Sequence, residues 1–266
     1  MLFISAGLAR ATVIDNSSDL IVPAGETYTL DGSHTYINSV QIDGTLYVTA
    51  YKGSGTTGNL ELIAPSIAIN GSIVADGRGY PAASGPGAGN YGNNGGGGGG
   101  YGGLGIKGYE GSGGGVYGSV IAPLDLGSGG GNAYYDGRGG AGGGKIKIDG
   151  GTLIINGTIS ANGEDGKVGG NRGGGGSGGS IYIIVGTFNG SGSITANGGS
   201  ESYKGGGGSG GRIAIYYGES SYTGRITAYG GSNYKSEWAG AGTIFMKSTS
   251  QSYGDLLIDN NNNEGI

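Results

Sequence analysis

The chain repeats one short sequence, and glycine-rich stretches separate the copies. Glycine accounts for 71 of the 266 residues. Four copies are clear and a fifth is degraded; they span residues 58–77, 143–163, 178–198, 210–230 and 241–260. Self-similarity at a nearly fixed period is typical of folds that stack one structural unit. The sequence therefore predicts a repeat architecture, and any function has to be sought on the faces of the stack.

Equivalent positions recur at a fixed spacing inside each copy. An aliphatic anchor is followed thirteen residues later by a second one, in the pairs Leu60 and Ile73, Ile146 and Ile159, Ile181 and Ile194, Ile213 and Ile226, and Ile244 and Leu257. Two residues before the second anchor stand the turn glycines Gly71, Gly157, Gly192 and Gly224, replaced by Asp255 in the fifth copy. A positive φ or a close backbone approach would exclude a Cβ there. We expect valine at these glycines to disrupt folding far more than valine in the middle of a glycine-rich joint.

Apolar and polar residues alternate with period two within each copy, which is typical of β-strands. Each copy then carries two short strands joined by a glycine-containing turn. We expect an all-β fold, a right-handed parallel β-helix or solenoid of roughly five to six coils. In this fold Ile146, Ile181, Ile213 and Ile244 form one inward ladder. An antiparallel meander is the competing architecture.

The copies and joints suggest a division of the chain. We expect N-terminal β coils at 12–57, a glycine-rich β-solenoid at 58–260 with a long insertion at 78–144, and the start of a linker or next unit at 261–266. Each glycine costs roughly 0.5–1 kcal/mol of chain entropy relative to alanine, so such density needs compensation. Polyglycine strands of the polyproline II type could pack edge to edge on one side of the solenoid. A flexible surface loop is the alternative for the insertion.

The N-terminus and the composition limit the cellular context. Residues 1–11 are similar to a truncated signal peptide, with an apolar run and a small-x-small cleavage site but no preceding positive charge. A buried first strand is the alternative. The net charge of −5 argues against a nucleic-acid partner, and the absence of cysteine excludes disulfides and thiolate metal sites. No stretch is apolar for long enough to span a membrane as a helix.

The repeats resemble a recurring glycine-rich module of large surface proteins, mostly bacterial. The resemblance is carried by VYGSVIAPLDLGSGGG at 116–131 and by the segments 175–199, 210–231 and 241–260, in that order. It covers nearly everything from about Tyr28 to Asn260. In that group the module usually sits in long secreted chains, beside adhesion or carbohydrate-binding domains. The resemblance implies an extracellular, non-catalytic module, and it carries over no catalytic residue.

No motif in the sequence supports catalysis. A polysaccharide-cleaving β-helix needs carboxylates, or lysine and arginine, clustered on adjacent coils. No acidic pair recurs at the outward positions of neighbouring copies. A nucleotide-binding loop lies between a hydrophobic strand and the start of a helix, and none of the Gly-x-Gly runs has this context. We therefore expect no enzyme activity, no cofactor and no metal.

The outward positions do suggest a binding surface. Tyr182, Ile184, Tyr216 and Phe245 are too apolar for a freely solvated sheet face. Either another layer covers them, such as the glycine-rich insertion, or they form an exposed aromatic strip that stacks on sugars or on a partner. Trp238, the sole tryptophan, is a further candidate for this strip.

These observations favour a structural or adhesive module of a secreted or cell-surface protein. A carbohydrate-binding or polysaccharide-cleaving β-helix is the alternative function. A solenoid exposes a strand edge at each open end, and such edges pair with other chains unless they are capped. We therefore expect other domains of a longer chain, or self-association around Leu256 to Asp259, to cover the C-terminal edge. Glycans are a second class of partner.

Overall fold

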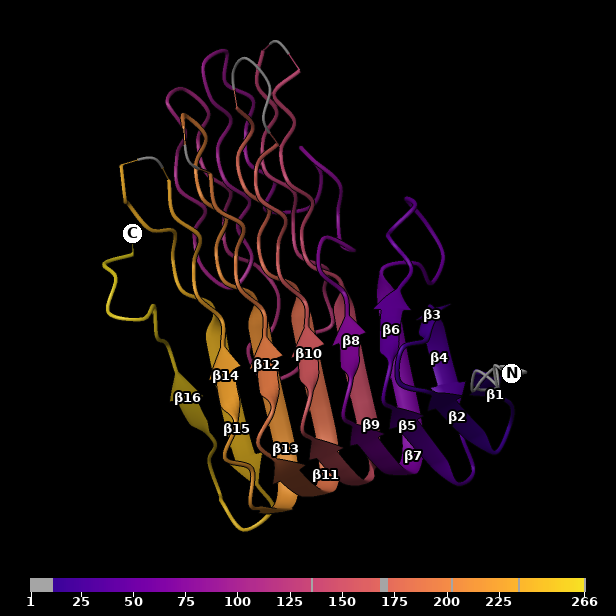
Figure 1. The fold of residues 1–266 in the computed structure, drawn as a ribbon. Helices are drawn as coiled ribbons and strands as arrows, with labels where there is room; N and C mark the ends of the chain where they lie inside the picture. The colour runs from indigo at the N-terminus through magenta and orange to yellow at the C-terminus, as the bar shows by residue number, and fades with distance from the viewer. Residues whose placement is uncertain (1–11, 135, 168–171, 202, 234, 266) are drawn as a thin grey trace, which may run out of the picture.

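A computed structural model describes residues 12–134, 136–167, 172–201, 203–233 and 235–265. The described residues form sixteen β-strands and no helix (Figure 1). The fold is therefore all-β, as the period-two alternation predicts. Residues 1–11, for which we predict a truncated signal peptide, lie outside the described residues.

The strands form an N-terminal group, four similar repeats and a C-terminal pair. The first group comprises β1 (Ile14–Asp15), β2 (Asp19–Val22), β3 (Thr27–Leu30), β4 (Gly32–Thr35), β5 (Ser39–Ile42) and β6 (Thr45–Val48). Each repeat has a long and a short strand: β7 (Asn59–Ile69) and β8 (Ser72–Val74), β9 (Lys145–Ile155) and β10 (Thr158–Ser160), β11 (Ser180–Gly190) and β12 (Ser193–Thr195), β13 (Arg212–Ser220) and β14 (Arg225–Thr227). The pair is β15 (Thr243–Ser248) and β16 (Asp255–Leu257). The first strand of each repeat, at 9 to 11 residues, is longer than the predicted short strand.

Two sheets hold these strands. The long sheet has ten strands in the order β1-β2-β5-β7-β9-β11-β13-β15-β16, with β4 also paired to β7. The short sheet has six strands in the order β14-β12-β10-β8-β6-β3. Neighbouring strands are parallel except for the β1–β2 and β15–β16 pairs. Parallel pairing of successive repeats excludes an antiparallel meander.

The predicted inward ladder is confirmed. Ile181 pairs with Ile146 on one side and with Ile213 on the other, and Ile213 pairs with Ile244. All four side chains are at most 4% exposed. The second anchors form a matching ladder in the short sheet, where Ile194 lies between its equivalents in β10 and β14.

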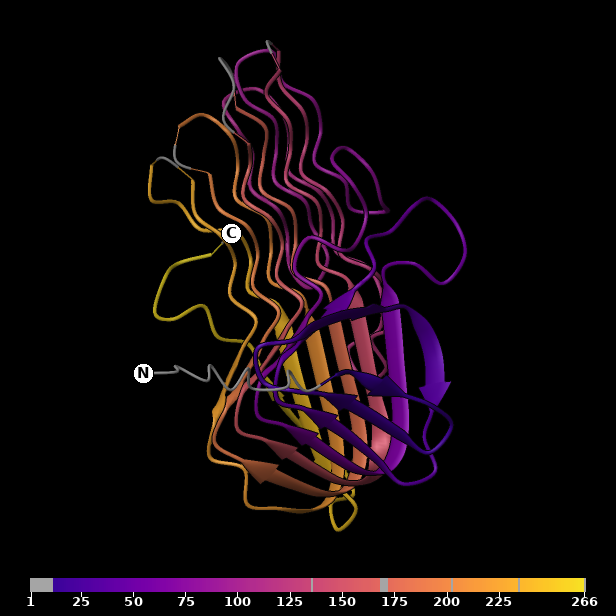
Figure 2. The ribbon, with the colours of Figure 1, turned by 45° about the vertical axis from the view of Figure 1, so that its right-hand side comes forward.

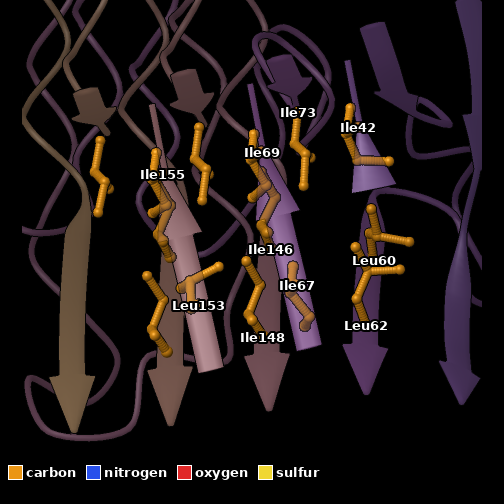
Figure 3. Packing of buried hydrophobic residues seen from close by; sticks show 14 of the residues in the cluster. Ile42, Leu60, Leu62, Ile67, Ile69, Ile73, Ile146, Ile148, Leu153 and Ile155 are labelled. Atoms are coloured by element: carbon orange, nitrogen blue, oxygen red, sulfur yellow. The ribbon is translucent and has the colours of Figure 1, made fainter. Parts of the chain in front are cut away.

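The core lies between the two sheets and is almost entirely aliphatic. The buried cluster draws side chains from twelve of the sixteen strands, and Figure 3 shows those of neighbouring strands aligned in rows. Small alanines such as Ala75, Ala161 and Ala196 follow the second anchors and are fully buried. Burying one aliphatic side chain contributes about 1.5–3 kcal/mol, so the stacked rows are the main source of stability in this part of the fold.

The turn glycines are required because the backbones of successive repeats touch. A Cβ on Gly71 would overlap the carbonyl oxygen of Gly44, one on Gly157 would overlap that of Gly71, and one on Gly192 would overlap that of Gly157. Gly224 meets Gly192 in the same way. None of the four turn glycines has a positive φ. The close approach is therefore the reason for glycine at these positions.

The fifth copy does not follow the predicted register. Leu257 lies in β16, which runs antiparallel to β15 and places Leu257 opposite Ile244, where it is 53% exposed. The position of the turn glycine is Asp255 in this copy. A Cβ there is incompatible with the backbone contact that each turn glycine makes, so the last strand folds back instead of extending the short sheet.

The joints form an ordered arm. Figures 1 and 2 show the glycine-rich segments running side by side away from the sheets, toward one end of the molecule. Their backbone hydrogen bonds repeat every three residues. In the central segment, 95–102, Gly96 and Gly99 donate to the carbonyl oxygens of Arg172 and Gly175, whereas Gly97 and Gly100 donate to those of Asn90 and Gly87. Successive residues thus bond to different neighbours.

Most arm glycines are as tightly packed as the turn glycines. A Cβ on Gly99 would overlap the carbonyl oxygen of Ser128, and one on Gly174 would overlap that of Gly97. We expected valine at the turn glycines to disrupt folding far more than valine in the middle of a joint, and the equally close backbone contacts at Gly99 and Gly174 contradict this difference. The absence of side chains lets neighbouring backbones approach within hydrogen-bond distance on several sides.

We predict that alanine at Gly157 or Gly99 lowers the free energy of unfolding by about 1–3 kcal/mol or more, because the new Cβ displaces backbone. Gly115 is the matched control, since a Cβ there has no neighbour within 4 Å and its φ is not positive. Gly115→Ala should change stability by no more than about 0.5 kcal/mol. Chemical denaturation of the three variants measures the difference, and equal losses at all three glycines would contradict the packing argument.

Candidate functional site

The outward face of the long sheet carries the residues that the sequence singles out. Strand register aligns Glu61, Lys147, Tyr182, Ala214 and Phe245 in one row across β7, β9, β11, β13 and β15. The next outward row contains Ile63, Asp149, Ile184, Tyr216 and Lys247. The face therefore has a charged end at β7 and β9 and an aromatic end from β11 to β15.

The charged end contains an ion pair beside a pocket. Lys147 Nζ lies 2.6 Å from Glu61 Oε1, and this hydrogen bond lowers the pKa of the Glu61 carboxyl. A pocket of about 230 Å³ adjoins the pair, lined by Ser33, Thr56 and Lys145 among others. Burial lowers the pKa of the Lys145 ammonium. Shifted pKa values beside a pocket are a feature of functional sites, although structural ion pairs produce them too.

The aromatic end is a continuous strip. The ring centroids of Tyr182 and Tyr216 lie 5.9 Å apart, and those of Tyr216 and Phe245 lie 5.7 Å apart. All three side chains are half-buried. The structure thus brings three of the four predicted strip residues together by stacking equivalent positions of successive repeats.

A segment of the glycine-rich insertion lies over part of this face. The Tyr216 hydroxyl donates to the carbonyl oxygen of Ile121 at 2.9 Å, and Ser180 Oγ donates to that of Asp125 at 2.6 Å. Ala214, in the same outward row as Tyr182, is completely buried. The sequence left open whether another layer covers these side chains or whether they form an exposed strip. Segment 116–126 covers part of the face, and the strip stays half accessible.

A buried arginine anchors this covering segment. The guanidinium of Arg212 donates through Nη2 to the carbonyl oxygen of Tyr117 at 2.7 Å and through Nη1 to Thr243 Oγ1 at 3.2 Å. It also lies 5.4 Å from the ring centroid of Tyr101, and its burial lowers its pKa. The Tyr101 hydroxyl is 2.6 Å from Ser180 Oγ, which itself donates to Asp125. Tyr101 therefore acts as the donor in this chain of hydrogen bonds.

Trp238 does not belong to the strip. It lies in the arm, where it forms isolated bridges to Ser232 and Gly265. Among the described residues, no ring contact joins it to Tyr182, Tyr216 or Phe245. Proximity along the chain to the last repeat is a poor guide to its position, because the joints extend away from the sheets.

The sequence reasoning missed a second exposed surface, at the end of the arm. Four tyrosines in its turns are about half exposed or more: Tyr91 54%, Tyr109 63%, Tyr134 52% and Tyr203 48%. The turns are neighbours, since the Tyr109 N–H donates to the carbonyl oxygen of Lys204 at 2.8 Å and Gly92 forms a bridge to Ala133. We refer to the described residues of these turns, 91–95, 107–111, 132–134, 136–137, 201, 203–205, 233 and 235–237, together as the tip.

The tip turns are held by specific contacts. Glu201 is buried, and its Oε2 accepts the backbone N–H groups of Tyr203, Lys204 and Gly205 at 2.7 to 2.9 Å. The Lys204 ammonium lies 5.7 Å from the ring centroid of Tyr109 and 5.3 Å from that of Tyr203. Tyrosines recurring in otherwise glycine-rich joints are the signal from which this surface could have been found.

Comparison with known proteins does not assign the chain to a group. No family model matches it, and no curated protein or solved structure is significantly similar to it. Within the described ranges, no group of three or more histidine, aspartate or glutamate side chains is placed to hold a metal ion. The same ranges contain no helix with the length and apolarity to cross a membrane.

The burial of Tyr101 predicts a pH dependence. Burial raises its pKa from the ordinary value of 10.0 to about 12, so the folded state favours the neutral phenol. The stabilisation that this provides is complete below pH 10 and is lost as pH rises through about 12. Between pH 10 and about 12, the free energy of unfolding should fall with rising pH less steeply in Tyr101→Phe than in the wild type. The expected difference in slope is up to about 1.4 kcal/mol per pH unit. Urea denaturation at several pH values measures the slope, with Tyr253→Phe, at an 88% exposed position, as the control. An unchanged slope in Tyr101→Phe would contradict the prediction.

Proposed function

We propose that the chain is a non-catalytic adhesive module of an extracellular or cell-surface protein, and that the tip is its contact surface. The observation that carries this proposal is the gathering of exposed tyrosines on neighbouring turns of the arm. Tyrosine supplies a large, rigid contact area with a polar end, at low cost in conformational entropy. A surface of this composition suits the recognition of a partner.

We further propose that the scaffold is a right-handed parallel β-solenoid carrying a bundle of polyglycine strands of the polyproline II type. The in-register parallel pairing of equivalent positions supports a solenoid, and parallel crossovers are right-handed in about 98% of cases. The three-residue period of the arm hydrogen bonds matches the three residues per turn of polyproline II. Such a bundle holds the tip turns at a fixed distance from the sheets.

A carbohydrate-binding or polysaccharide-cleaving face is the second candidate. The pocket beside Glu61 and Lys145 on the outward face favours it, because both groups have shifted pKa values. Cleavage by a pair of carboxylates needs a second acid across from the first. The partner of Glu61 is the Lys147 ammonium, so this candidate ranks below adhesion.

We predict that Tyr109→Ser combined with Tyr203→Ser weakens binding to the recognised surface or glycan by about tenfold or more, as expected for central aromatic contacts. Tyr253→Ser is the matched control, since Tyr253 is 88% exposed but lies in the connection between β15 and β16, away from the arm. Binding of the purified proteins to a glycan array and to cell surfaces measures the effect. Reducing-sugar release is assayed on the same samples. Unchanged binding in the double variant would contradict the adhesive tip, and sugar release that is lost in Lys145→Met would favour the second candidate.

We also propose that the chain self-associates through the end of the short sheet. Among the described strands, β14 pairs only with β12, so its other edge is open. A cavity of about 330 Å³ adjoins this edge, lined by Tyr217, Ile226, Met246 and Leu257 among others. A strand of a second copy could pair with β14 and fill the cavity.

Self-association predicts that the apparent mass rises with concentration in light scattering. Leu257→Lys should shift the protein toward monomer, because it places a charge at the rim of the cavity on a side chain that is 53% exposed. Ile121→Lys, at a position that is 54% exposed on the covering segment, should leave the mass unchanged. A wild-type monomer at high concentration would count against the proposal.

A further inference from the structure

A small polar pocket lies at the tip, between residues 107–109 on one side and residues 233 and 235–237 on the other. Its volume is about 110 Å³, and its lining comprises Lys107, Gly108, Tyr109, Asn233, Lys235 and Glu237. It is separate from the aromatic strip and from the pocket beside Glu61, which lie on the outward face of the long sheet. Figures 1 and 2 show the glycine-rich segments carrying the arm turns away from that sheet.

The walls of this pocket are held by internal hydrogen bonds. Asn233 Oδ1 accepts the backbone N–H groups of Lys235 and Glu237 at 2.9 and 3.0 Å. Asn233 Nδ2 donates to Glu237 Oε2 at 2.7 Å, which holds that carboxylate in place. On the opposite wall, the backbone of Tyr109 is tied to Lys204 and its ring lies beside the Lys204 ammonium. The pocket is therefore an organised feature of the tip.

The charges of the lining favour an anion. The lining contains two lysines and one glutamate, which together carry one net positive charge. This local excess of positive charge stands out in a chain whose net charge is −5. Lysine ammonium groups bind carboxylate and sulfate oxygens through charge-assisted hydrogen bonds. The carboxylate of Glu237 and the amide of Asn233 can hydrogen-bond sugar hydroxyls beside the anionic group.

The exposed ring of Tyr109 supplies the second element of recognition. Tyr109 lines the pocket and is 63% exposed. An aromatic face of this kind stacks on the apolar face of a sugar ring. The pocket is small, so it has room for the charged group and the adjoining part of one ring, while the rest of an oligosaccharide lies outside.

We propose that this pocket binds the anionic group of an acidic saccharide, carboxylated or sulfated, with the sugar ring against Tyr109. The proposal rests on the proposed function, in which the tip is the adhesive surface. It adds the chemical class of the ligand and the residues that select it: Lys107 and Lys235 for the charge and Tyr109 for the ring.

The test measures binding of the full chain to three immobilised probes: a glucuronate-containing oligosaccharide, a sulfated oligosaccharide and neutral maltotriose. Wild-type protein should bind at least one acidic probe about tenfold more tightly than the neutral probe, and this preference should diminish as salt is raised. The Lys107→Gln, Lys235→Gln double variant should lose the preference. The control is Lys52→Gln with Lys167→Gln, which removes the same charge from exposed lysines outside the pocket. Circular dichroism confirms that both variants are folded.

The outcomes separate this proposal from the adhesive function. Binding to only one acidic probe supports the proposal and identifies the anionic group. Equal binding to the neutral probe, or equal losses in the two lysine variants, overturns it. If Tyr109→Ser with Tyr203→Ser abolishes adhesion while the pocket lysine variant binds normally, the ligand class is wrong and the adhesive tip stands. If neither variant affects adhesion, both proposals fail.

Discussion

Direct contact between backbones that carry no Cβ is the constraint on which the whole structure depends. It operates twice, first at the turn glycines, where Gly157 rests on Gly71, and again through the arm, where Gly174 rests on Gly97. In the first place it sets the spacing of the repeats and brings their aliphatic anchors into ladders. In the second it replaces most side-chain packing, so that backbone hydrogen bonds between neighbouring segments hold a long arm in which few side chains, such as Tyr101 and Ile106, are buried.

The two contact regions differ in how well the sequence predicts them. The inward ladder through Ile181 and the short sheet through Ile194 follow from periodicity and spacing, because each position carries a side chain that can be aligned. For the arm, the sequence predicts packed polyglycine strands but not which strands are neighbours. A glycine such as Gly99 has no side chain that identifies its partners, which include Gly175 far along the chain. The fold-back of β16 was missed because the spacing to Leu257 is kept while the turn glycine is lost.

The candidate surfaces follow the same division. The strip of Tyr182, Tyr216 and Phe245 lies at equivalent positions of stacked strands, so register alone assembles it. The sequence suggests that the glycine-rich insertion covers the strip, but it does not show that segment 116–126 is the part that does so. This segment is anchored by a single arginine, Arg212, which no repeat pattern identifies. The tip was not predicted at all. It exists only because the arm brings turns from distant parts of the chain to one place.

The position of segment 95–102 within the arm affects the order in which the protein can assemble. This segment bonds to 87–90, but also to 172–175 and 206–210, which are synthesised later. The central segment of the arm is therefore synthesised before most of the segments that hydrogen-bond to it. The arm is complete only when the glycine-rich joints of the later repeats have been synthesised. Contacts between such distant residues make folding slow, so the sheets, whose repeats stack on their immediate predecessors, provide the template on which the arm is completed.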